Sequence, residues 1–161
     1  MSDERAVQQV LARYVRAADS RNGPAMSELF VPDGRVEIFA GQQTPEHLGT
    51  LEGAEAIGQA VAAMMTPHPD RGWSHHVTMD HLIEIKADEA TLDAQFIRFD
   101  TLGDERPAGG WPRGASGAQG SVRPTEAGYY RSRLVRVDGR WRLAHHAIYL
   151  DLPPAFGSNE A

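Results

Sequence analysis

Two strand hairpins fill most of the second half of the chain and constrain its fold more than any other feature. The first spans residues 75–101 and turns at Ala87-Asp88-Glu89, and the second spans residues 129–150 and turns at Asp138-Gly139-Arg140. An Asp-Gly pair is a strong signal for a tight turn between antiparallel strands. Because the helical patterns all precede these hairpins, the order predicts an α+β fold rather than alternating strands and helices.

The first half of the chain predicts three helices. Apolar residues recur at helical spacing over residues 7–18, and Asn22-Gly23 ends this helix. Proline suits the first turn of a short second helix over residues 24–30. A third helix is expected over residues 53–65, where a proline soon follows.

The remaining segments are predicted from their turn-forming residues. A short strand is expected at 35–40, followed by a loop over 41–52. The Gly/Pro-rich stretch 102–127 is a flexible insertion or, alternatively, a lid over a pocket with Trp111 as its apolar anchor. We expect a single domain over residues 1–152 and a flexible tail over 153–161.

Composition excludes several classes of function. A net charge of −6 argues against nucleic acid or an anionic membrane surface as a partner. The absence of cysteine excludes disulfides, thiolate catalysis and cysteine-zinc sites. No apolar run suits a signal peptide or a membrane span, so we expect a cytoplasmic protein.

Three segments in order carry a family resemblance: RYVRAADSRNGPAMSELFVPDGRVEIF, EGAEAIGQAV and GYYRSRLVRVDGRWRLAHHAI. Together they resemble the nuclear transport factor 2-like superfamily and, within it, the SnoaL-like branch. The resemblance implies a cone-shaped, curved mixed β-sheet wrapped by three N-terminal helices around an apolar pocket. It also implies a homodimer formed through the outer sheet face, or in some members a trimer.

Two enzyme groups within the superfamily place candidate residues. The scytalone dehydratase and hexachlorocyclohexane dehydrochlorinase group carries an Asp near the end of helix one and a His at the start of a central strand. Asp19 and His76 match these places. Tyr14 and His146 fall on further pocket positions of the dehydrochlorinase. Tyr14 also matches the oxyanion-hole Tyr of ketosteroid isomerase, but Ile38 stands near the place of that enzyme's base and argues against the same activity.

These residues suit general acid-base catalysis. A neutral imidazole at His76 is a suitable base near neutral pH, and the Asp19 carboxylate would orient it and stabilise the imidazolium. Tyr14 could donate a hydrogen bond to a developing oxyanion, and His146 could act as the opposing acid. We therefore expect a cofactor-independent lyase, isomerase or cyclase, such as a dehydratase or a polyketide cyclase, with no metal.

The expected substrate is a small, largely apolar organic molecule. Tyr130 is assigned to the inner sheet face because its strand mates Ser132 and Leu134 suit an interior better than their neighbours do. The full set of expected substrate contacts is Tyr130, Trp111, Phe39, Leu134 and Phe96.

Other interpretations stay open at this point. Asp19 could simply cap a turn, and Tyr14, His76 and His146 could be ordinary core residues. The chain could be a non-catalytic ligand-binding or assembly module, since members of this fold include such proteins. It could also be an epoxide-hydrolase-like hydrolase, in which Asp80 or Arg98 would assist Asp19.

Overall fold

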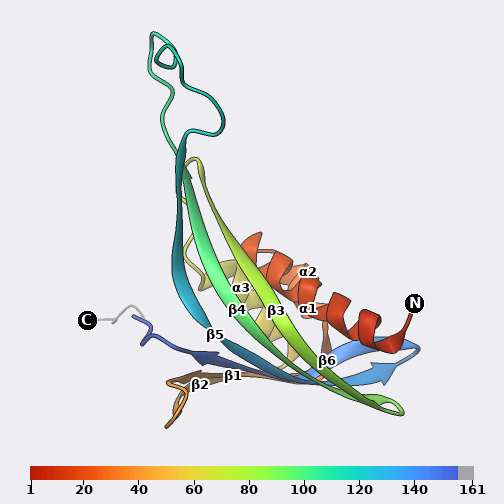
Figure 1. The fold of residues 1–161 in the computed structure, drawn as a ribbon. Coiled ribbons are helices and arrows are strands. Elements are labelled where there is room, and N and C mark those ends of the chain that lie inside the picture. Colours follow the sequence, from red (N-terminus) through yellow and green to blue (C-terminus); the bar gives the residue numbers. More distant parts are fainter. Residues whose placement is uncertain (156–161) are drawn as a thin grey trace.

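The computed structural model describes residues 1–155, which form one six-stranded sheet with three helices on one of its faces (Figure 1). The helices are α1 (Asp3–Asp19), α2 (Gly23–Ser27) and α3 (Ala54–Ala63), and the strands are β1 (Phe30–Ala40), β2 (Glu46–Glu52), β3 (Gly72–Lys86), β4 (Glu89–Gly103), β5 (Gly120–Val137) and β6 (Arg140–Leu150).

The sheet is mixed, strongly curved and unclosed. Its strand order is β2-β1-β6-β5-β4-β3, and every neighbouring pair is antiparallel except the parallel pair of β1 and β6. Figure 1 shows the strands bending around the helices, which cover the concave face. The predicted α+β class, with helices wrapped by a curved mixed sheet, is therefore confirmed.

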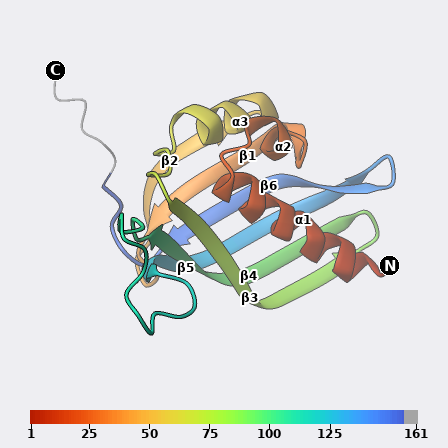
Figure 2. The same ribbon diagram turned by 90° about the horizontal axis from the view of Figure 1, so that it is seen from above.

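Helix α1 forms because its ends are capped and its apolar residues share one face. The Ser2 hydroxyl accepts a hydrogen bond from the Arg5 backbone N–H at 3.3 Å, which satisfies one of the free amides of the first turn. Val7 and Leu11 are buried against the sheet. The helix crosses the sheet obliquely (Figure 2) and packs mainly on β3. This crossing brings the C-terminal residue of α1 to the beginning of β3.

Helices α2 and α3 pack through their backbones. A Cβ atom added to Gly23 would lie 2.6 Å from the Gly58 carbonyl oxygen, and one added to Gly58 would lie 2.6 Å from the Gly23 oxygen. Only glycine fits at so close an approach, because a real Cβ atom does not come within 3.0 Å of a neighbouring backbone atom. The glycine pair therefore sets the short distance between these two helices.

Two predicted loops are partly strand. Residues 41–52 were expected to be a loop, but residues 46–52 form the edge strand β2. Apolar and polar side chains do not alternate along this strand. Pairing with β1 determines this strand, since strand propensity depends strongly on the neighbour. Strand β5 begins at Gly120 rather than near Tyr129, because β4 continues to Gly103 and pairs with it. Pro124 sits next to the irregularity in this pairing, where a missing N–H is tolerated.

The remaining insertion is the loop 104–119, which lies beyond the end of the long β4–β5 ribbon and away from the helices (Figure 1). Trp111 is 39% exposed there, so the expectation that it anchors a lid over the pocket is wrong. Of the predicted tail, residues 156–161 lie outside the described part. No helix within residues 1–155 is long and apolar enough to cross a membrane.

Candidate functional site

Asp19 and His76 form a hydrogen-bonded pair beneath the end of α1. The two residues are 57 positions apart in sequence, yet His76 Nδ1 lies 2.6 Å from Asp19 Oδ1. The other carboxylate oxygen accepts the His76 backbone N–H at 2.9 Å. The Ser74 hydroxyl donates to Asp19 Oδ1 at 3.0 Å. With three donors on one carboxylate, the side chain is held in a single orientation, and only about a tenth of it is exposed.

The charge of Asp19 is stabilised although it lies at the negative end of a helix. Burial raises the pKa of Asp19, but the hydrogen bonds from His76 and Ser74 outweigh burial, and the net shift is downward. The carboxylate is therefore ionised at neutral pH. An ionised carboxylate can only accept, so His76 Nδ1 carries a proton, and the other ring nitrogen, Nε2, holds the lone pair in the neutral ring.

The Nε2 atom of His76 is the ring nitrogen that Asp19 leaves without a partner. Within residues 1–155, no hydrogen bond is found for His76 Nε2. This atom is also not one of the polar atoms that are fully buried and lack a hydrogen-bond partner. A base needs such an atom, with one nitrogen anchored and the other free to accept a proton. The arrangement provides what an oriented general base requires, and it holds Asp19 by contacts with β3 as well as at the helix end.

Sequence reasoning missed two residues that support this pair. Ser74 lies two residues before His76 and therefore shares its face of β3, so strand parity could have indicated it. His68 bonds through Nε2 to the Asp19 carbonyl oxygen at 2.6 Å and stacks on Trp73 with ring centroids 4.5 Å apart. His68 lies in the connector between α3 and β3, where no sequence pattern points to it.

Aromatic rings line the concave face beside the pair. Phe96 stacks on Tyr130 with ring centroids 4.2 Å apart, and Tyr14 meets Tyr130 edge to face at 5.7 Å. The expected inward direction of Tyr130 is confirmed. Burial raises the pKa of both tyrosines, and the negative charge of Glu126 raises it further. Both phenols therefore stay protonated at neutral pH and can donate a hydrogen bond.

His146 does not fit the role of an opposing acid. Its ring is fully buried, and Nδ1 lies 2.8 Å from the Ser132 hydroxyl. Burial lowers the pKa of His146 to about 3, so the ring is neutral and has no proton to give as an imidazolium. Its Nε2 is sealed from solvent and has no partner among residues 1–155. The ring instead packs 4.2 Å from the Tyr14 ring and fixes its position.

A row of polar residues crosses three strands next to the pair. His76 on β3 is the register partner of Arg98 on β4, and Arg98 is the partner of Glu126 on β5. The charges of Arg98 and Glu126 both act on the Tyr130 hydroxyl, which places them near the same ring. Arg98 also donates to Asp100 at 3.0 Å. A molecule at His76 would thus meet a cation and an anion as well as the phenols.

Two expected substrate contacts are placed differently, and one lies in the core. Phe39 stacks on Tyr149 with centroids 4.8 Å apart, and the Arg131 guanidinium lies 4.6 Å from the Tyr149 ring. These residues face the outer side of the sheet, so the expectation that Phe39 lines the cone is wrong. Trp111 lies in the exposed loop described above. Leu134 is buried in the core.

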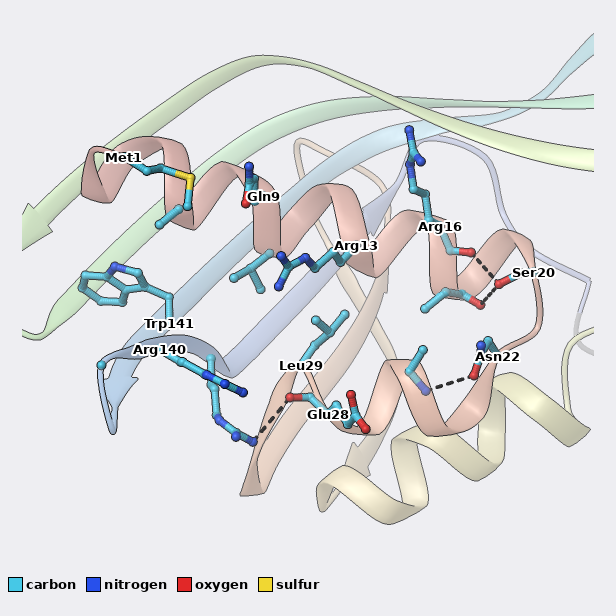
Figure 3. Close-up of a pocket in the computed structure, with 16 residues that line it drawn as sticks. Met1, Gln9, Arg13, Arg16, Ser20, Asn22, Glu28, Leu29, Arg140 and Trp141 are labelled. Carbon is cyan, nitrogen blue, oxygen red and sulfur yellow. Dashed lines mark hydrogen bonds between the residues drawn. The ribbon is translucent and has the colours of Figure 1, made fainter.

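Two cavities in residues 1–155 lie away from the dyad. One, of about 1100 Å³, runs between α1, α2 and the start of β6 (Figure 3). The other, of about 450 Å³, lies on the outer sheet face. Neither is lined by Asp19 or His76. No group of three potential metal ligands is found in the described residues.

Comparison with known proteins agrees with the geometry. A family model described as SnoaL-like domain matches residues 1–147. No curated protein is found to match. Among solved structures, the chain is similar to Mycobacterium tuberculosis Rv3472, of unknown function, with 23% identity, TM-score 0.63 and coverage of 92% of this chain and 71% of that one.

The chain is also similar to two further solved structures. One from Novosphingobium aromaticivorans, whose description names scytalone dehydratase as its candidate activity, shares 17% identity at TM-score 0.62, with 99% of this chain and 95% of that one covered. LinA shares 15% identity at TM-score 0.63, with 98% and 92% covered. At these identities the likeness shows a common fold.

Proposed function

Because this chain belongs to the SnoaL-like domain family and holds an anchored imidazole on the concave face of its sheet, we propose that it is a cofactor-independent lyase, isomerase or cyclase. The observation that carries the proposal is the 2.6 Å contact of Asp19 with His76 together with the unpartnered Nε2. The substrate is a small, largely apolar organic molecule with an acidic C–H bond.

The proposed step begins with His76 Nε2 taking a proton from carbon. The electron pair of the broken C–H bond moves to a neighbouring carbonyl oxygen or expels a leaving group on the next carbon. Asp19 stabilises the imidazolium that forms, since its carboxylate is already hydrogen-bonded to Nδ1. The Tyr14 and Tyr130 hydroxyls, which belong to the aromatic cluster on the concave face, are the candidates to donate a hydrogen bond to an oxyanion. The imidazolium then returns the proton to carbon or to the leaving group.

Deuterium exchange tests the proton abstraction without knowledge of the natural substrate. We expect the protein to catalyse exchange of carbon-bound hydrogen in a panel of cyclic ketones, such as 2-tetralone, in D₂O. His76→Ala should lower this rate by about 10²- to 10⁴-fold, the usual contribution of a general base. His75→Ala is the matched control, because it removes the neighbouring, exposed ring on the same strand.

Two results would reject the proposal. One is an exchange rate that His76→Ala and His75→Ala change equally. The other is incorporation of ¹⁸O from labelled water into the product of an epoxide substrate, which would identify hydrolysis instead. Retention of the wild-type near-ultraviolet circular dichroism shows that a loss of activity in the variant is not a loss of fold.

The outer sheet face supports the expected homodimer, which we also propose. It carries the Phe39–Tyr149 stack with Arg131 above it, and Leu82 on β3 is 71% exposed. Aromatic residues and arginine are enriched at protein interfaces. Sedimentation equilibrium should give twice the monomer mass, and Tyr149→Asp should shift the population toward monomer. A monomeric wild-type protein at all concentrations would contradict this proposal.

A further inference from the structure

A cavity lies on the side of α1 that faces away from the dyad. It is a groove of about 1100 Å³ between α1, α2 and the β5–β6 hairpin. Figure 3 shows Arg13 on the helix side and Arg140 on the hairpin side, with Leu29 at the same groove. The function proposed above uses none of these residues.

The charge in this groove is unbalanced. Four arginines line it, and the one acidic lining residue is Glu28. Arg142 donates to the Glu28 backbone oxygen at 3.4 Å. This hydrogen bond does not involve the Glu28 carboxylate and therefore does not neutralise the arginine. No ion pair is found for Arg13 or Arg140 within residues 1–155. A chain of net charge −6 thus gathers uncompensated positive charge in one place.

The second cavity provides an internal comparison. On the outer sheet face, Arg131 and Arg133 are matched by Glu84 and Asp93, and Arg131 pairs with Asp93 at 3.0 Å. Both cavities expose arginine, but only the groove beside α1 lacks the carboxylates to neutralise it. Unneutralised guanidinium groups, with their planar fork of donors, are suited to carboxylates supplied by another molecule.

The arginine side chains of the groove indicate a charged partner. Of its apolar lining residues, Val10, Leu29 and Trp141 are only 5%, 9% and 7% exposed, whereas Met1 is 87% exposed. The guanidinium groups on the walls remain available to carboxylates. The groove follows α1, whose 17 residues span about 25 Å at ~1.5 Å per residue. That length holds about eight residues of extended peptide at ~3.3 Å each.

We propose that this groove binds an extended acidic peptide segment of a partner protein, with Arg13 and Arg140 contacting its carboxylates from opposite walls. The site is separate from the Asp19–His76 pair, because it lies on the other side of α1. Attraction between the guanidinium groups and the peptide carboxylates provides most of the binding, so binding weakens as salt is added.

The test uses a fluorescein-labelled decapeptide of alternating Glu and Ala, titrated with the full chain and followed by fluorescence anisotropy. We expect saturable binding at low salt that weakens at high salt. The double variant Arg13→Gln/Arg140→Gln should weaken binding about tenfold, as expected for the loss of two exposed charge pairs. The control variant Arg106→Gln/Arg123→Gln makes the same change in net charge at two exposed arginines, one in the loop 104–119 and one in β5. It should leave the affinity unchanged.

Three outcomes would overturn the proposal. These are absence of saturable binding by the wild-type chain, an equal loss in both double variants, and tighter binding of a labelled decathymidylate than of the peptide. The last result would assign the groove to a nucleic acid phosphate backbone. Because neither double variant touches His76, exchange activity in D₂O should persist in both, which separates this test from that of the proposed function.

Discussion

The buried ring of His146 makes the stability of this protein depend on pH in a calculable way. The pKa of His146 is lowered by burial to about 3 in the folded chain, whereas a histidine in an unfolded chain has a pKa of ~6.5. Between these two values the unfolded state binds the proton and the folded state does not. The contribution of His146 to stability is therefore complete above ~pH 6.5 and is lost as the pH falls toward 3.

The size of the effect follows from the two pKa values. Proton binding to the unfolded state favours unfolding about 25-fold more near pH 5 than near pH 7, which corresponds to roughly 2 kcal/mol. The lowered pKa of Asp19 adds nothing in this interval, because its contribution is lost only below the unfolded value of ~3.9. His81, whose pKa burial also lowers, acts in the same direction as His146 and is present in both proteins compared below.

The comparison is between the wild type and His146→Gln, which removes the titrating ring and keeps a polar side chain of similar size. Urea unfolding followed by tryptophan fluorescence should show that the difference in unfolding free energy between the two proteins changes by roughly 2 kcal/mol between pH 7 and pH 5. His75→Phe, which replaces an exposed ring, controls for the loss of one histidine. A difference that stays constant over this interval would refute the assignment of His146 as a buried neutral ring.

Two further predictions concern the sheet. Gly128→Ala should destabilise the fold by about 3 kcal/mol or more, because the added Cβ would lie in contact with the Tyr149 carbonyl oxygen; unchanged thermal unfolding would contradict the close approach of β5 and β6. Replacing residues 104–119 by a short Gly-Asn turn should change the unfolding free energy by less than ~1 kcal/mol and leave ketone exchange intact, since this loop extends beyond the β4–β5 ribbon and away from the helices. A loss of exchange would show that the loop contributes to the site.

The sequence predicted the fold through its strongest local signals. The helical periodicity of α1 and the two hairpin turns are set by residues close together in the chain, and all three agree with the structure. Strand β2 and the first half of β5 could not be predicted in this way. Their residues are polar or turn-forming, and the partners that make them strands lie elsewhere in the chain.

The site was predicted in part, for a related reason. The resemblance of the sequence brought Asp19 and His76 together, and the structure places them 2.6 Å apart. Parity along β5 assigned Tyr130 correctly to the concave face. Phe39 was misplaced because no parity argument was applied to β1, where Val36 and not Phe39 faces the core. The neutral state of His146 depends on burial, which sequence alone does not reveal.

The central claim is that Asp19 holds a proton on His76 Nδ1 and leaves Nε2 free to act as a base. Proton NMR of the histidine rings at neutral pH tests it most directly. We predict a downfield, exchange-protected Nδ1 proton for His76 that disappears in Asp19→Asn and persists in His75→Ala. A His76 Nδ1 that carries no proton, or a proton signal unaffected by Asp19→Asn, would contradict the account.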